Sequence, residues 1–123
     1  MPITTNIKAS NLTLTPSVAD YVDKKLIRHI ERFISRDDSS ARADVELAKT
    51  SRHHNTSEEV FRAEINLHIG SMHLRAEAVN QDMFGAIDKL KDEILRELTS
   101  SKKKRFALFK YGAQQIKKIL RRE

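Results

Sequence analysis

Polar and apolar residues alternate along four stretches of the chain, as they do in strands with one buried face. The stretches cover residues 3–9, 41–50, 60–69 and 72–79. Gly70 and Ser71 separate the last two and predict a two-residue hairpin turn with glycine in the first central position. This turn fixes the register, so we expect the pairs Ile69–Met72, His68–His73, Asn66–Arg75 and Glu64–Glu77. The inward-facing residues are Ile3, Thr5, Ile7, Ala9, Ala43, Val45, Leu47, Phe61, Ala63, Ile65, Leu67, Ile69, Met72, Leu74, Ala76 and Ala78.

Two other stretches carry apolar residues at three- and four-residue spacing, which predicts amphipathic helices. The first begins at Thr15 as N-cap, with Pro16 in the first turn, and ends before the polar segment 35–40. The second begins where Asn80 and Asp82 offer a cap. The stripes are Val18, Val22, Leu26, Ile30, Phe33 and Ile34, then Met83, Ile87, Leu90, Ile94 and Leu98, with Phe84 beside the second.

The order of these elements is β-α-β-β-β-α. Because the other strand face is charged and polar, both helices must cover the same apolar face. The predicted fold class is therefore an α+β two-layer sandwich, a four-stranded sheet with two helices on one face.

Amino-acid composition limits the classes of protein to which the chain can belong. The chain has 123 residues, 39% of them hydrophobic, which suits one domain with a modest core. It has no cysteine, which excludes disulfides and thiolate metal sites. We see no signal-peptide pattern and no apolar run long enough to span a membrane, so we expect a soluble, cytoplasmic protein.

Positive charge is concentrated at one end of the chain. The formal net charge is +6, but residues 99–123 hold nine basic residues and one acid, which leaves the rest mildly acidic. Such asymmetry predicts a polyanionic partner, with RNA, DNA and an anionic membrane all open. We divide the chain into an α+β domain, residues 1–101, and a basic, flexible C-terminal tail, residues 102–123.

The basic tail contains features that packing does not explain. Lys102–Arg105 are four consecutive cations, and Phe106, Phe109 and Tyr111 interleave with further cations. This mixture can pair with phosphates and stack on bases. Docking of the aromatic residues onto the domain is the alternative.

Basic residues also occur on the predicted domain. Lys25, Arg28, Arg32 and Arg36 share an outward stripe of the first helix, although acids nearby also fit a solvated face. A second cluster follows the strand 41–50, where a loop lets side chains reach a partner, or is an ordinary polar loop. That cluster is Lys49, Arg52, His53 and His54.

We find no pattern typical of an enzyme or a metal protein. His68 and His73 are predicted cross-strand neighbours, but structural zinc normally takes four ligands, so two surface histidines are the simpler interpretation. Three glycines provide no phosphate-binding loop. The like-charged Glu64 and Glu77 need Arg62 and Arg75 between them. No cofactor, metal or catalytic residue is predicted, and the expected activity is binding.

Longer segments resemble a known family, the hibernation-promoting factors, also called ribosome-associated inhibitors. The segments that carry this resemblance are NLTLTPSVADYVDKKL, which opens the first helix, and FRAEINLHIGSMHLRAEAVNQDMFGAIDKLKDEILREL. Within the second, Leu74–Glu77 and Asp82–Asp88 carry the strongest likeness. The resemblance covers about residues 1–105.

The resemblance implies a cytoplasmic bacterial protein that binds the small ribosomal subunit near the decoding centre, in the mRNA and tRNA channel. It would stop translation and preserve ribosomes under stress or in stationary phase. The implied fold is like a double-stranded-RNA-binding domain with an added strand. The implied rRNA-binding residues are Lys24, Lys25, Arg28, Arg52, Lys89, Lys91, Arg96, Lys102, Lys103, Lys104 and Arg105.

Two features depart from the family pattern. About 18 residues follow Arg105, too few for the second, dimerising domain of long members, so a short form is expected. The segment FALFKYGAQQIKKILRRE would form a short amphipathic helix, unstable alone, that orders on rRNA or a ribosomal protein. Two other functions remain open: a general structured-RNA-binding module or RNA chaperone, and a membrane-surface protein anchored weakly by this stripe.

Overall fold

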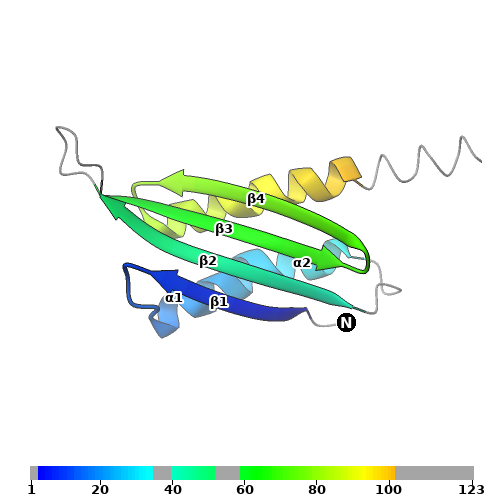
Figure 1. Ribbon diagram of the computed structural model, residues 1–123, viewed down its shortest axis with the longest axis horizontal. Coiled ribbons are helices and arrows are strands. Elements are labelled where there is room, and N and C mark those ends of the chain that lie inside the picture. Colours follow the sequence, from blue (N-terminus) through cyan, green and yellow to red (C-terminus); the bar gives the residue numbers. More distant parts are fainter. Residues whose placement is uncertain (1–2, 35–39, 52–58, 102–123) are drawn as a thin grey trace, which may run out of the picture.

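The structure is a computed structural model that describes residues 3–34, 40–51 and 59–101. Its four strands form one sheet in the order β1-β2-β3-β4, and all helices lie on one face of it (Figure 1). β1 and β2 are parallel, while β2–β3 and β3–β4 are antiparallel. The predicted fold class is confirmed. The bounds are Thr4–Ser10 (β1), Ala41–Ser51 (β2), Glu59–Ile69 (β3) and Met72–Asn80 (β4).

The first helical stretch begins as predicted but contains an unpredicted wide turn. It consists of α1 (Pro16–Val22), a π-helical segment η1 (Asp23–Ile27) and α2 (Arg28–Phe33). The Thr15 hydroxyl oxygen accepts a hydrogen bond from the Val18 amide at 3.2 Å, and Pro16 occupies the first turn.

Spacing explains the π turn. The buried residues Val22, Leu26 and Ile30 are each four positions apart, and four residues overshoot one α-helical turn by about 40°. In η1 the Arg28 amide bonds the Asp23 carbonyl, five residues back, which widens the turn. Leu26 and Ile27 can then both face the core, at 0% and 1% exposure. The predicted stripe lacked Ile27.

Residues 83–101 form a regular second helix, coloured yellow to orange in Figure 1. The Asp82 carboxylate accepts a hydrogen bond from the Gly85 amide at 2.9 Å, so the predicted cap is confirmed. This helix and α1 begin at the same end of the sheet (Figure 1). Its buried residues are Met83, Ala86, Ile87, Leu90, Ile94 and Leu98, which include the whole predicted stripe.

The β3–β4 hairpin has the predicted register, with all four expected pairs present. Gly70 has φ of 59°, a value that glycine adopts without the cost that a Cβ brings. Because a one-residue slip would turn the apolar residues to solvent, the buried Ala63, Ile65 and Leu67 hold this register as well.

The core lies between the sheet and the helices. The inward residues of β2 and β3 are almost fully buried except Phe61, which is partly buried, whereas those of the edge strand β1 are half-buried. Ala48 faces outward but is buried at 7%, outside the core cluster, beside Ser10 and Arg62 in the register. The likeness to a double-stranded-RNA-binding domain stays a prediction, and the proposed tail, 102–123, lies outside the described residues.

Candidate nucleic-acid interface

The first helical stretch presents three of the predicted RNA-binding residues, all exposed. Lys24 pairs with Asp20 at 3.1 Å, and Arg28 pairs with Asp23 at 3.6 Å across the π turn. Lys25 has no ion-pair partner among the described residues. All four paired side chains are more than half exposed, and such pairs add little stability. A phosphate can therefore replace either carboxylate at small cost.

The second helix does not gather its predicted residues into one patch. Lys89 donates from Nζ to the Val79 carbonyl at 3.5 Å and so lies on the side of β4. Lys91 lies three residues after Asp88, on the side that faces the first helical stretch, and is 3.7 Å from Asp92. Arg96 donates to Glu93 at 2.8 Å. These three cations are divided between two sides of one helix.

The remaining predicted residues cannot be placed. Arg52 and the run Lys102, Lys103, Lys104 and Arg105 lie outside the described residues, as do Arg36, His53 and His54. Their roles stay predictions.

Charge in the described part of the chain is nearly balanced, with 12 basic and 13 acidic residues. Residues 102–123 hold nine basic residues and one acid. The charge that would attract a polyanion therefore lies almost entirely in the terminal segment.

An aromatic and acidic contact joins the two helices near their N-terminal ends. The Tyr21 hydroxyl donates to both oxygens of Asp88, at 2.9 and 3.0 Å. The hydrogen bond to Asp88, followed by partial burial, raises the pKa of Tyr21. The ring of Phe84 meets that of Tyr21 edge to face, with centroids 4.8 Å apart, and is 37% exposed. Sequence reasoning missed this contact; its signal is that Tyr21 and Asp88 flank the buried Val22 and Ile87.

The outer face of the sheet carries a closed ion-pair cluster. Arg62 Nε lies 2.7 Å from Glu77, and Arg75 Nε lies 2.6 Å from Glu64, with two further contacts completing the ring. The predicted interleaving of arginines between Glu64 and Glu77 is confirmed. The hydrogen bond from Arg75 lowers the pKa of Glu64, and the bond to Glu77 raises the pKa of Arg62. These four charges satisfy one another and leave little attraction for phosphate.

The outer face also carries the two predicted histidine neighbours. The rings of His68 and His73 stack with centroids 4.4 Å apart and an interplanar angle of 1°, and His73 Nε2 lies 3.0 Å from the side-chain oxygen Oδ1 of Asn66. Across the described ranges, no three histidine, aspartate or glutamate side chains converge as a metal site would require.

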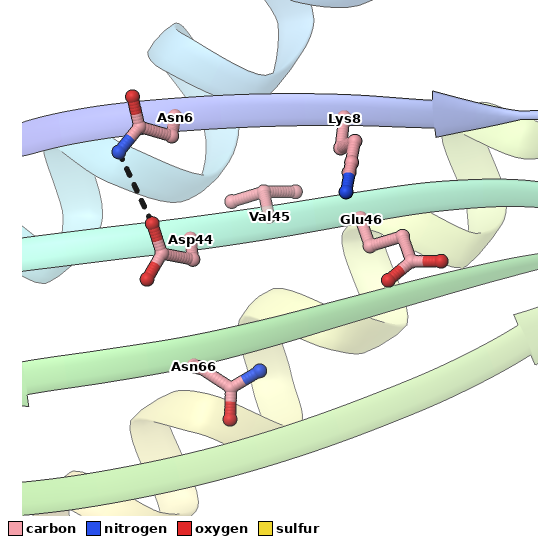
Figure 2. A pocket seen from close by; sticks show the side chains of 6 residues that line it. All are labelled: Asn6, Lys8, Asp44, Val45, Glu46 and Asn66. Atoms are coloured by element: carbon pink, nitrogen blue, oxygen red, sulfur yellow. Dashed lines mark hydrogen bonds between the residues drawn. The ribbon is translucent and has the colours of Figure 1, made fainter.

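A hollow of about 260 Å³ lies on this face across β1, β2 and β3. Asn6 Nδ2 donates to Asp44 at 3.1 Å (Figure 2), Asp44 pairs with Arg42 at 3.2 Å, and Glu46 accepts from Ser10 at 3.5 Å. The amide of Asn6 and the carboxylates of Asp44 and Glu46 thus bond to neighbouring side chains. Ligand pockets are usually larger, about 300–1,000 Å³. The lining residues are Asn6, Lys8, Asp44, Val45, Glu46 and Asn66.

In the part of the chain that the structure describes, no helix combines the length and apolar character needed to cross a membrane.

Comparison with protein families gives a match over most of the chain. Residues 5–105 match the family described as Sigma 54 modulation protein / S30EA ribosomal protein. The chain is 31% identical over 99 residues to the "Ribosome hibernation promotion factor" of Bacillus subtilis (strain 168), covering 80% of this chain. It spans about half the length of that relative, 48%.

A shorter relative and a solved structure match over nearly their whole lengths. The "Ribosome hibernation promoting factor" of Klebsiella oxytoca is 31% identical over 99 residues, which cover 80% of this chain and 93% of that protein. The N-terminal domain of Thermus thermophilus Protein Y superposes with a TM-score of 0.60 at 29% identity. That match covers 84% of this chain and 98% of the other.

Proposed function

Because the chain belongs to the Sigma 54 modulation protein / S30EA ribosomal protein family, we propose that it binds the small ribosomal subunit near the decoding centre. There it occupies the channel that mRNA and tRNA use, inhibits translation and preserves inactive ribosomes under stress or in stationary phase. The protein acts in the cytoplasm by binding, without catalysis or a cofactor. The likeness to the Klebsiella oxytoca protein, across 93% of that relative, is the observation that carries this proposal.

Within this proposal, the two parts of the chain have separate tasks. The domain over residues 1–101 supplies a rigid shape that fits the channel. Residues 102–123 neutralise rRNA phosphates, with the run Lys102–Arg105 placed directly after the second helix. The near balance of charge in the described residues supports this division, since a neutral surface attracts RNA only weakly.

The first helical stretch adds a smaller set of contacts. Lys25 has no competing carboxylate among the described residues, so it meets a phosphate most readily. Lys24 and Arg28 exchange their exposed partners Asp20 and Asp23 for phosphates. Lys89, Lys91 and Arg96 contact rRNA from two sides of the second helix, and Arg52 contacts it beyond β2.

A general RNA-binding module or RNA chaperone is the second candidate. The concentration of cations in one segment favours it, because such a segment binds any polyanion. The two candidate functions predict different results when free RNA competes with ribosomal subunits for the protein.

Competition distinguishes them. The labelled full-length chain is bound to small subunits, and bulk duplex RNA is added in mass excess. Ribosome-specific binding predicts that most of the protein stays with the subunits. Complete displacement by duplex RNA would instead support the general RNA-binding function.

A further inference from the structure

One exposed surface between the helices does not fit a role in phosphate binding. We call it the aromatic–carboxylate patch, and it consists of Tyr21, Phe84, Asp82 and Asp88. Phe84 is 37% exposed, one of two large apolar side chains exposed to this degree among the described residues; the other is Val79. Covering the exposed part of this ring with a partner would gain hydrophobic free energy.

The ring of Phe84 is held in position. Tyr21 meets it edge to face at 4.8 Å with an interplanar angle of 76°. Tyr21 is itself fixed by the hydrogen bonds from its hydroxyl to Asp88. The 37% of Phe84 that stays exposed is an ordered aromatic surface on which a flat group can stack.

Two carboxylates accompany this ring along the second helix, and Lys91, on the same side as Asp88, pairs with Asp92 instead. Neither Asp82 nor Asp88 forms an ion pair with a described residue. Both lie close enough to Tyr21 for their charges to raise its pKa. One carboxylate oxygen of Asp82 accepts a hydrogen bond from the Gly85 amide, and Asp88 accepts only the Tyr21 hydroxyl in the described structure. Each carboxylate can therefore accept further hydrogen bonds.

A stacking surface beside two carboxylates is complementary to a guanidinium group. Arginine stacks on aromatic faces and pairs with carboxylates through its planar fork of donors. A phosphate would instead meet repulsion from Asp82 and Asp88. We infer that the aromatic–carboxylate patch docks an arginine side chain from a basic peptide segment of a partner protein.

This inference does not depend on ribosome binding, because it rests on the chemistry of the patch alone. It adds a protein contact to a chain whose other predicted contacts are with RNA. The test therefore measures peptide binding directly.

Chemical shifts of the isotope-labelled full-length chain provide the test. The probe is acetyl-Gly-Arg-Gly-Arg-amide, with the lysine peptide of the same design beside it. The amides of Tyr21, Phe84 and Asp88 should shift saturably, and the arginine peptide should bind tighter than the lysine peptide. Shifts spread over other surfaces, or no saturable shift, would overturn the proposal.

Two variants sharpen the test, each with a matched control. Phe84→Leu removes the ring and Asp88→Asn removes the charge while keeping an acceptor for Tyr21; each should weaken arginine-peptide binding about two- to fivefold. Val79→Ala and Glu97→Gln alter an exposed apolar residue and an exposed carboxylate away from the patch, and should leave binding unchanged. Equal effects from variants and controls would contradict the proposal.

Other occupants give different outcomes. If a single-stranded oligouridylate shifts the patch amides more strongly than the peptide does, the patch belongs to an RNA interface and the proposal is wrong. A further variant tests whether the chain's own basic run occupies the patch. In this full-length variant, glutamine replaces Lys102, Lys103, Lys104 and Arg105. If those changes alone move the patch amides, that run is the occupant, and the partner-peptide proposal is likewise wrong.

Discussion

The domain and the basic segment of this chain differ most in how their charges are arranged. In the described residues, 12 basic and 13 acidic side chains are interspersed, and many are paired, as in the Arg62–Glu77 contact on the outer sheet face. Residues 102–123 hold nine basic residues against a single acid. In the proposed function, the domain therefore supplies a shape that fits the partner, and residues 102–123 supply electrostatic attraction for phosphate.

This difference teaches which property each part contributes to binding. A balanced, packed domain fits one cavity and rejects others by its shape, with little dependence on salt. A cationic segment strengthens binding to any phosphate backbone and makes it strongly salt-dependent. Changes in the two parts should therefore affect different observables.

The largest effect is expected in the domain core. Leu90 is fully buried, so Leu90→Ala should lower the free energy of unfolding by about 2–5 kcal/mol, through lost burial and the cavity that remains. Thermal unfolding followed by circular dichroism measures this. Subunit binding should weaken only as far as the domain unfolds, with an unchanged salt slope. A changed slope in the folded variant would break the proposed separation of tasks.

The next effect concerns the basic run. Changing Lys102, Lys103, Lys104 and Arg105 together to glutamine should weaken binding to the small subunit about a hundredfold or more near 0.1 M salt. The slope of log K against log salt should fall in magnitude by about 3, since four phosphate contacts are lost. Binding measured across a salt series gives both values. The free energy of unfolding should not change, and an unchanged salt slope would contradict the role of this run.

A smaller effect distinguishes two adjacent lysines. Lys25→Gln should weaken binding about fivefold near 0.1 M salt, the loss of one phosphate contact. Lys24→Gln is the matched control and should have a smaller effect, because Lys24 already pairs with Asp20 at 3.1 Å. The same binding assay compares them. Equal losses would show that the Asp20 pair does not compete with rRNA.

The smallest effect lies on the outer sheet face. The bonded arginines lower the pKa of Glu64, so its ionised form stabilises the fold above the ordinary glutamate pKa, and this contribution disappears as pH falls through the lowered pKa. Glu64→Gln should cost up to about 1 kcal/mol at neutral pH and nothing at strongly acidic pH. Denaturant unfolding across pH measures this. If Glu64→Gln still lowers the free energy of unfolding at strongly acidic pH, the effect comes from packing and not from the charge of Glu64.

Local patterns predicted the fold well because they coincide with its packing. Alternation and the Gly70–Ser71 turn set the β3–β4 register, and Thr15 and Asp82 cap the helices as expected. The π turn was missed because a drift of about 40° per four-residue step is small enough for a regular α-helix to accommodate over a short stretch. Ile27 completes the core only once that turn widens.

The candidate site was harder to predict. Exposure of Lys24, Lys25 and Arg28 followed from helical spacing, but the ion pair of Arg28 depends on the π turn, which brings Asp23 to it. The Tyr21–Asp88 contact joins residues 67 positions apart; local patterns place each residue beside a buried one but do not pair the two. The division of Lys89 from Lys91 likewise follows from where β4 and the first helical stretch lie.

Co-sedimentation of the full-length chain with separated small and large bacterial ribosomal subunits tests the central claim most directly. The account predicts saturable, one-to-one pelleting with the small subunit at near-physiological salt and little with the large one. Equal pelleting with both subunits and with bulk RNA, or none with either, would contradict it.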